Sequence, residues 1–242
     1  MIPKVIHYCW FGRNPLPKSA IKCISSWRKF FPDYEIKEWN EDNFDVNCIP
    51  YTRDAYASKK YAFVSDYARF LILYQYGGLY FDTDVEVIKS FDDIVRQGPF
   101  MGVEVPAIGS RLPIVAPGLG LGVNPGLGLY GDVVEVYKTL PFRDANGAIN
   151  KHTVVPITTE LLVRSGLKTS CKIQYVAGIW VYPSDFFNPL DSVTGKMTIT
   201  ENTRSIHWYM ASWSDESRFY RFLSRLYHRL VVTFRCHNRH IL

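Results

Sequence analysis

Asp82 and Asp84, one residue apart, are the side chains of this sequence best suited to bind a metal ion. They follow Leu79-Tyr80-Phe81, a run short and apolar enough to be a buried strand. Ligands of open α/β sheets bind at the carboxyl ends of strands, which is where the two acids would lie. Like charges repel there unless a cation lies between them, and carboxylate oxygens suit Mg²⁺ and Mn²⁺. The pattern favours a divalent-metal site, and an exposed turn with two solvated acids is the alternative.

A second pair of charged residues, Asp66 and Arg69, lies inside the most strongly predicted helix, residues 59–76. That helix is apolar nearly all round, which is typical of a buried helix. Residues three apart share a helix face, and buried charges must be paired or must bind something. Either the two form an internal ion pair, or their face looks into the same cleft as Asp82.

A third candidate site is the polar and aromatic segment 207–214. A lone histidine on a strand is more often a core residue than a ligand. His207, however, is close in sequence to the indole of Trp208 and the hydroxyls of Tyr209 and Ser212. These polar and aromatic neighbours favour a functional site over a core position.

Hydrophobic periodicity predicts the elements that must position these residues. Strands are expected at 4–10 and 34–39 around a helix at 17–31, so the chain opens as β-α-β, typical of a mostly parallel sheet. Gly77 and Gly78 are expected to end the long helix. After Asp84 we expect a strand at 85–88, helices at 133–140 and 156–165, strands at 172–176, 179–182, 196–200 and 204–209, and a loop at 183–189.

The Gly- and Pro-rich stretch 98–132 has no strand-then-helix setting, so a dinucleotide-binding fingerprint is not expected there. It is expected to be loop and strand lining a cleft, or a plain connection.

The composition indicates a globular α/β protein with a substantial core. A length of 242 residues and a hydrophobic content of 47% fit one large domain, or one domain with a small appendage. The five cysteines include no C-x-x-C pair, so neither a disulfide framework nor a zinc site is indicated. With no visible signal peptide or membrane span, we expect a cytoplasmic or peripheral membrane protein.

The formal charge of +5 is concentrated at the C-terminus. We divide the chain into a domain at 1–214 and a tail at 215–242, where an apolar helical stripe alternates with six arginines. A basic amphipathic helix is typical of binding to an anionic membrane surface, at about 1 kcal/mol per basic residue. The alternative is a terminal helix packed on the domain. Nucleic acid is not an expected partner.

Several motifs in order resemble the DXD sugar-transferase family. They are Ile2-Pro3-Lys4-x-Ile6-His7-x-x-Trp10, Ser65-Asp66-Tyr67-x-Arg69, Leu73-Tyr74-x-Tyr76-Gly77-Gly78-x-Tyr80-x-Asp82-x-Asp84, and His207 with Ser212-Trp213. This family includes bacterial capsular polysaccharide transferases and the yeast initiating mannosyltransferase, and it shares a core signature with the glucosyltransferase domains of large clostridial toxins. The resemblance is close over 1–90 and 205–214 and loose over 95–200.

The resemblance implies a GT-A-type, Rossmann-like nucleotide-binding fold around a mostly parallel mixed sheet. It also implies a UDP- or GDP-sugar donor, Mn²⁺ or Mg²⁺, and retention of anomeric configuration. The resemblance implies that Trp10 stacks on the nucleobase, that Asp66 and Arg69 contact the donor sugar and the diphosphate, and that Tyr80 contacts the donor. It implies that Asp82 binds ribose or metal, that Asp84 binds metal, and that His207 binds metal or diphosphate. Ser212 and Trp213 would form a lid over the phosphates.

The function expected from residues and resemblance together is a metal-dependent retaining glycosyltransferase. Its acceptor would be a glycan or a lipid-linked oligosaccharide in capsular or other surface polysaccharide synthesis. No protein nucleophile is evident in the sequence, so we expect front-face attack with a donor phosphate oxygen taking the acceptor's proton. A toxin-like transferase that modifies a protein, and a sugar-nucleotide-binding protein without catalysis, are the alternatives.

Overall fold

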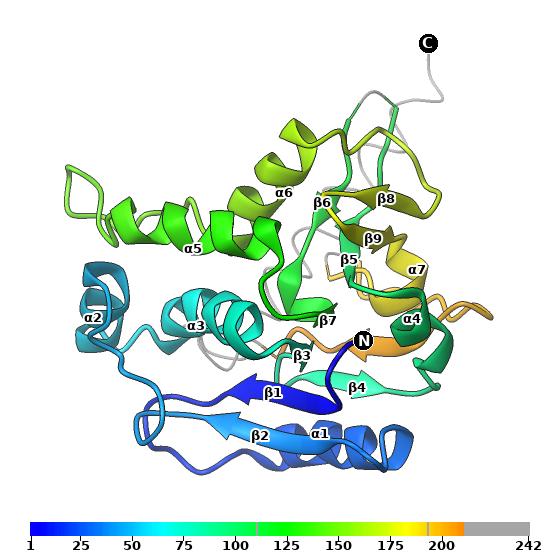
Figure 1. Cartoon of the computed structure of the whole chain (residues 1–242), viewed down its shortest axis with the longest axis horizontal. Helices are drawn as coiled ribbons and strands as arrows, with labels where there is room; N and C mark the ends of the chain where they lie inside the picture. The colour runs from blue at the N-terminus through cyan, green and yellow to red at the C-terminus, as the bar shows by residue number, and fades with distance from the viewer. Residues whose placement is uncertain (110, 193, 211–242) are drawn as a thin grey trace.

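The structure is a computed structural model, and it describes residues 1–109, 111–192 and 194–210 (Figure 1). The expected basic tail lies outside the described residues, and so do Ser212 and Trp213.

The strands, in chain order, are β1 Val5–Cys9, β2 Glu35–Trp39, β3 Gly78–Tyr80, β4 Val85–Val87, β5 Phe100–Val105, β6 Ile114–Val115, β7 Leu121–Val123, β8 Gln174–Val176, β9 Ile179–Tyr182 and β10 Ser205–His207. The helices are α1 Lys18–Phe30, α2 Pro50–Ala57, α3 Tyr61–Tyr76, α4 Asp92–Gln97, α5 Gly128–Thr139, α6 Val154–Arg164 and α7 Ser184–Phe187, with a 3₁₀ turn at Pro117–Leu119. No helix in these described ranges is both long and apolar enough to cross a bilayer.

The main sheet has the strand order β2-β1-β3-β7-β5-β9-β8, with β6 paired to β5. Pairing is parallel for β1 with β2 and β3, and for β5 with β9. It is antiparallel for β7 with both β3 and β5, and for β8 with β9. Strands β2, β1, β3, β5 and β9 therefore run in one direction, which confirms the expected α/β class with a mostly parallel mixed sheet.

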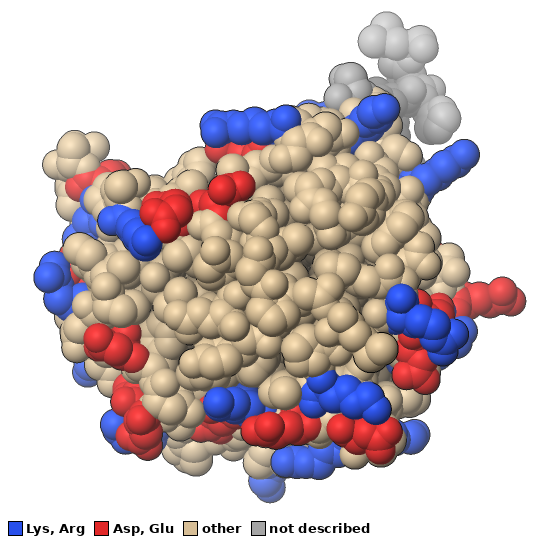
Figure 2. All heavy atoms as spheres, viewed as in Figure 1, with Lys and Arg blue, Asp and Glu red and all other residues tan. Residues whose placement is uncertain are grey.

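Helices cover both faces of this sheet. In β3, Leu79 packs in a core cluster with residues of α1 and α4, while Tyr80 packs in a cluster with residues of α2, α3, α5 and α6. Successive residues of a strand point to opposite faces, so the two clusters lie on opposite sides of the sheet. Figure 1 shows α3 and α5 side by side on one of these sides. On the face drawn in Figure 2, acidic and basic side chains are interspersed around the rim and uncharged residues fill the centre.

The turn from α3 into β3 is built from glycine and fixed by a buried histidine. Gly77 and Gly78 have φ values of 65° and 99°, and a Cβ on Gly78 would lie 2.7 Å from the carbonyl oxygen of Val5. His7 Nε2 donates to the Gly77 carbonyl (3.0 Å), and its Nδ1 accepts from Trp39 Nε1 (3.0 Å). Because a carbonyl only accepts and an indole N–H only donates, these two partners define the tautomer. The bonds tie β1, β2 and the start of β3 together, directly before Asp82.

Several expected elements differ in the structure. Helices α2 and α4 form where neither was expected, and the expected loop at 183–189 contains α7. The strand expected at 196–200 is wrong, since only an isolated bridge joins Met197 to Leu190. Thr200 Oγ1 donates instead to the Asp185 carboxylate (3.2 Å). Such side-chain bonds offer the chain an alternative to a sheet ladder.

Candidate functional site

A cavity of about 410 Å³ lies over the carboxyl ends of β1, β3 and β5. This is the end of the sheet at which the sequence predicted a site. The cavity lining includes every candidate residue that falls within the described part of the chain: Trp10, Asp66, Arg69, Tyr80, Asp82, Asp84 and His207.

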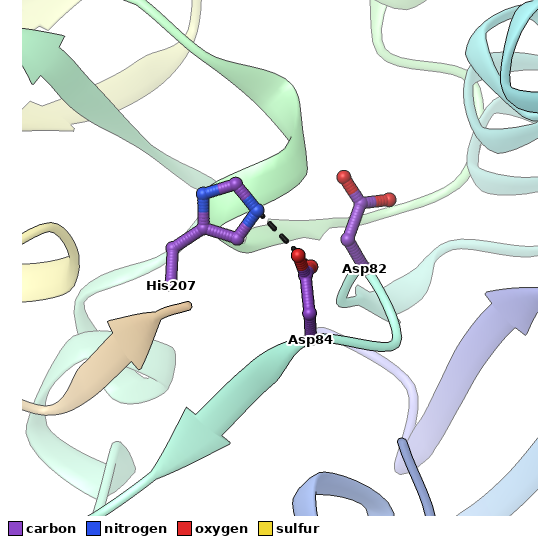
Figure 3. Close-up of side chains that lie close together, drawn as sticks. All are labelled: Asp82, Asp84 and His207. Carbon is purple, nitrogen blue, oxygen red and sulfur yellow. Dashed lines mark ion pairs between the residues drawn. The ribbon is translucent and has the colours of Figure 1, made fainter. Parts of the chain in front are cut away.

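Asp82, Asp84 and His207 converge inside this cavity. One ligand atom from each, two carboxylate oxygens and one imidazole nitrogen, lie within 4.8 Å of one another. Figure 3 shows Asp84 between the other two side chains, with the Nε2 of His207 3.1 Å from Asp84 Oδ1. The Nδ1 of His207 is buried and has no hydrogen-bond partner among the described residues. Two hard oxygens and an imidazole fit a divalent cation such as Mn²⁺.

Asp84 and His207 change each other's pKa. Burial alone would lower the pKa of His207, but the hydrogen bond and the charge of Asp84 outweigh burial and raise it. Burial alone would raise the pKa of Asp84, but the hydrogen bond and the charge of His207, together with the amide of Met210, lower it. The pair therefore stabilises negative charge on Asp84 and positive charge on His207, and a divalent cation bound there would take the place of the His207 proton.

His207 reaches the site through a strand pairing that the sequence did not predict. Strand β10 pairs antiparallel with β4, directly after Asp84, and puts His207 opposite Val85. Beyond β10 the amide of Trp208 donates to the Asp84 carbonyl (3.0 Å), and the amide of Met210 donates to Asp84 Oδ2 (2.9 Å). Asp84 is thus both a candidate metal ligand and the anchor of segment 207–210.

Arg69 joins α3 to the loop that follows β3. Its side chain is 5% exposed, and Nη2 lies 3.0 Å from Asp66 Oδ1 and 3.2 Å from Asp82 Oδ1. The guanidinium also lies over the ring of Tyr80, whose hydroxyl donates to Asp82 Oδ1 (3.1 Å). Both interpretations offered by the sequence therefore hold, because Asp66 and Arg69 form an ion pair and face the same cavity as Asp82.

The Gly- and Pro-rich stretch contributes Gly118 to the cavity wall, as expected for a cleft-lining segment. The amide of Asp82 donates to the carbonyl of Gly118 (3.3 Å), and a Cβ on Gly118 would overlap Asp82 Oδ2. A larger residue at this position would therefore displace the Asp82 carboxylate from its present place. The sequence did not single out Gly118, because nothing local distinguishes it from the neighbouring glycines.

Trp10 lies at the end of the cavity nearest β1. The loop that carries it is held by hydrogen bonds within the loop and to Glu41. Its indole donates to the carbonyl of Asn14 (2.6 Å). Glu41 Oε1 accepts from the amide of Gly12 (2.6 Å) and from the hydroxyl of Tyr56 (2.8 Å). Tyr209, from the candidate segment 207–214, also lines the cavity, whereas Glu104 was missed from the sequence because only the tertiary fold brings it there.

Comparison with known proteins gives one family over part of the chain. The family model described as "Glycosyltransferase sugar-binding region containing DXD motif" matches residues 17–101. Inositol phosphoceramide mannosyltransferase 3 of Schizosaccharomyces pombe is 33% identical over 99 residues, 39% of this chain and 28% of that protein. Mannosyl phosphorylinositol ceramide synthase CSH1 of Saccharomyces cerevisiae is 29% identical over 105 residues, 42% of this chain and 28% of that protein. The chain thus spans less than a third of the length of these two relatives.

Two solved structures are similar at lower identity. The PaToxG glycosyltransferase has 19% identity and a TM-score of 0.48, over 67% of this chain and 69% of that one. A glycosyltransferase involved in glycosylation of the major capsid of PBCV-1 has 12% identity and a TM-score of 0.49, over 94% of this chain and 100% of that one.

The matched region holds the aspartates and the arginine that line the cavity. Residues 17–101 of this chain are thus similar to the glycosyltransferase sugar-binding regions that contain a DXD motif.

Proposed function

We propose that this protein is a metal-dependent, retaining glycosyltransferase that moves a sugar from a nucleotide-diphosphate sugar to a glycan or lipid-linked acceptor. The observation that carries the proposal is the convergence of Asp82, Asp84 and His207 in one cavity with Arg69 and Trp10. The family match over residues 17–101 and the names of the two yeast relatives support sugar transfer as the activity.

The proposed donor lies along the cavity. Trp10 stacks on the nucleobase, and Asp66 and Arg69 hold the diphosphate and hydroxyls of the sugar. Tyr80 contacts the donor, and Asp82 contacts ribose or the metal. The remaining roles proposed are metal ligation by Asp84 and His207, and closure over the phosphates by Ser212 and Trp213, which lie outside the described residues.

A divalent cation held by Asp82, Asp84 and His207 would neutralise charge on the departing diphosphate. Arg69 supplies a second, permanent positive charge next to these ligands. Its Nε donates to the Ser65 carbonyl (3.2 Å), and its Nη2 is shared by two carboxylates, so the guanidinium is held in place before the donor arrives. A preorganised charge of this kind stabilises a developing anion without reorganising.

For the transfer step we propose attack from the face that the diphosphate leaves. The bond from the acceptor oxygen to the anomeric carbon forms as the bond to the diphosphate oxygen breaks. The acceptor's proton passes to an oxygen of the leaving diphosphate. Trapping a covalent glycosyl-enzyme would contradict this route.

The acceptor and the cellular site are also proposals. We propose a surface polysaccharide acceptor at the cytoplasmic face of a membrane, reached through the basic tail at 215–242. The names of the two yeast relatives favour a second candidate, a phosphoinositol-containing ceramide lipid that receives mannose. Assaying both acceptor types with the same donor distinguishes them.

The test of activity is a screen of UDP- and GDP-sugars with Mn²⁺, read as release of the nucleoside diphosphate. One donor should be turned over, and Asp84→Asn should reduce that turnover by about a hundredfold or more, as for loss of a group that stabilises the transition state. The matched control is Asp132→Asn, the same replacement at an exposed position of α5. Wild-type turnover by Asp84→Asn would refute the site, and absence of turnover with every donor would favour a binding protein.

A further inference from the structure

Glu104 is a carboxylate in the cavity to which the proposed function assigns no role. It is the penultimate residue of β5, and it lines the cavity together with Asp82, Asp84 and His207. Among the described residues it forms no ion pair, whereas Asp82 pairs with Arg69 and Asp84 lies 3.1 Å from the imidazole of His207.

The side chain of Glu104 is anchored on one oxygen only. The hydroxyl of Tyr209 donates to Oε1 (3.1 Å), and no described residue donates to Oε2. The ring of Tyr209 in turn packs on the ring of His207, with centroids 4.2 Å apart. Tyr209 has a φ of 49°, in the left-handed region that non-glycine residues rarely adopt, so its placement is imposed by the surrounding structure. An ionised carboxylate only accepts hydrogen bonds, so the group that complements its open oxygen is a donor such as a hydroxyl.

The strand order places Glu104 relative to the other parts of the cavity. Trp10 follows β1, Asp82 follows β3 and Glu104 lies in β5, and the order across the sheet is β1-β3-β7-β5. Neighbouring strands are about 4.8 Å apart. Along the sheet edge, β1 is therefore one strand spacing from β3, and β5 is two strand spacings from β3 on the other side, about 10 Å away. Glu104 is therefore separated from the Trp10 end of the cavity by the DXD residues.

A nucleotide-diphosphate sugar has the same linear order. Its base and its sugar lie on opposite sides of the diphosphate. With the base on Trp10 and the diphosphate at Asp82, Asp84 and His207, the sugar extends towards β5. A sugar is rich in hydroxyl donors, and Glu104 offers an open acceptor at that side.

We propose that Glu104 binds a hydroxyl of the sugar that is transferred, with Tyr209 as the residue that positions its carboxylate. This inference rests on the proposed function. It makes Glu104 a determinant of donor-sugar recognition that contributes nothing to binding of the nucleoside diphosphate.

The test compares affinities of two probes in the presence of Mn²⁺: the sugar nucleotide found in the donor screen, and the corresponding nucleoside diphosphate. Glu104→Ala should weaken binding of the sugar nucleotide by about tenfold or more, the usual effect of losing a hydrogen bond to a charged group, and leave binding of the nucleoside diphosphate unchanged. Glu104→Gln keeps the shape and one acceptor oxygen and should lose less. Tyr209→Phe should lower only the affinity for the sugar nucleotide, because the carboxylate remains but is less well held.

Glu135→Ala, at an exposed position of α5, is the matched control and should change neither affinity. Equal losses for both probes in the Glu104 variants would mean that Glu104 acts through the metal ligands, and would overturn the inference. Unchanged affinity for both probes would overturn it as well. Failure of the wild-type protein to bind Mn²⁺ with any nucleoside diphosphate is a different result, which refutes the proposed function itself.

Discussion

Replacing His7 with glutamine should make the stability of the fold less sensitive to acid. Burial lowers the pKa of His7 from 6.5 to about 4. Between these two values the unfolded chain binds a proton that the folded chain does not, so the free energy of unfolding falls as the pH falls. Integrated from about pH 7 to about pH 4.5, this one group removes about 2 kcal/mol from the stability of the wild-type protein.

Glutamine suits the test because its side-chain amide can replace both bonds of the imidazole. Its N–H₂ can donate to the Gly77 carbonyl and its oxygen can accept from Trp39 Nε1, while the position no longer titrates. Urea unfolding of both proteins across this pH range gives the comparison. The stability of His7→Gln relative to wild type should rise by about 2 kcal/mol as the pH falls from about 7 to about 4.5.

A second buried group makes the comparison with the variant necessary. Burial raises the pKa of Asp66 to about 6, against an ordinary value of 3.8. Here the folded chain binds the extra proton, so this group adds stability as the pH falls through that window, opposite in sign to His7. The wild-type curve is therefore flatter than His7 alone would make it, and only the difference between the two proteins isolates the histidine.

His152→Gln removes an imidazole whose side chain is 41% exposed and serves as the matched control. A stability difference between His7→Gln and wild type that stays constant from neutral to acid pH would refute the reasoning. So would the same pH-dependent difference in the control.

Three further outcomes are expected. Gly118→Ala should weaken Mn²⁺ binding, measured by calorimetry, because the new Cβ displaces the Asp82 carboxylate. The control Gly128→Ala, where a Cβ meets no atom within 4 Å, should leave the affinity for Mn²⁺ unchanged. Trp10→Leu should weaken binding of the nucleoside diphosphate and spare that of free Mn²⁺, and equal losses of both would contradict the stacking role. Deleting 215–242 should release the protein from vesicles of anionic phospholipid in a flotation assay, whereas unchanged binding would exclude the tail as the membrane contact.

The first ninety residues were largely predictable because local signals and tertiary structure agree there. The apolar helix at 59–76, its glycine stop and the short strand before Asp82 correspond to α3, the Gly77–Gly78 turn and β3. Each has a strong local cause, namely continuous apolar periodicity, positive φ at glycine, and a buried apolar run.

The middle of the chain was less predictable because its elements are short and depend on their neighbours. Strand β7 has only three residues, Leu121–Val123, in a stretch rich in glycine, yet it joins the two parallel halves of the sheet. Its central residue, Gly122, is required because a Cβ there would overlap the ring of Phe100, a contact invisible in the sequence. Glu104 was missed for the same reason, since its hydrogen-bond partner Tyr209 lies 105 residues later in the chain.

The pairing of β10 with β4 also bears on when the proposed metal site could form during protein synthesis. The DXD residues emerge from the ribosome early, but the amide that caps Asp84 belongs to a residue 126 positions later. A nascent or prematurely ended chain that stops short of His207 carries both aspartates without their imidazole partner. Under the proposed function, metal capture, and with it any consumption of activated sugars, would be reserved for chains translated through residue 210.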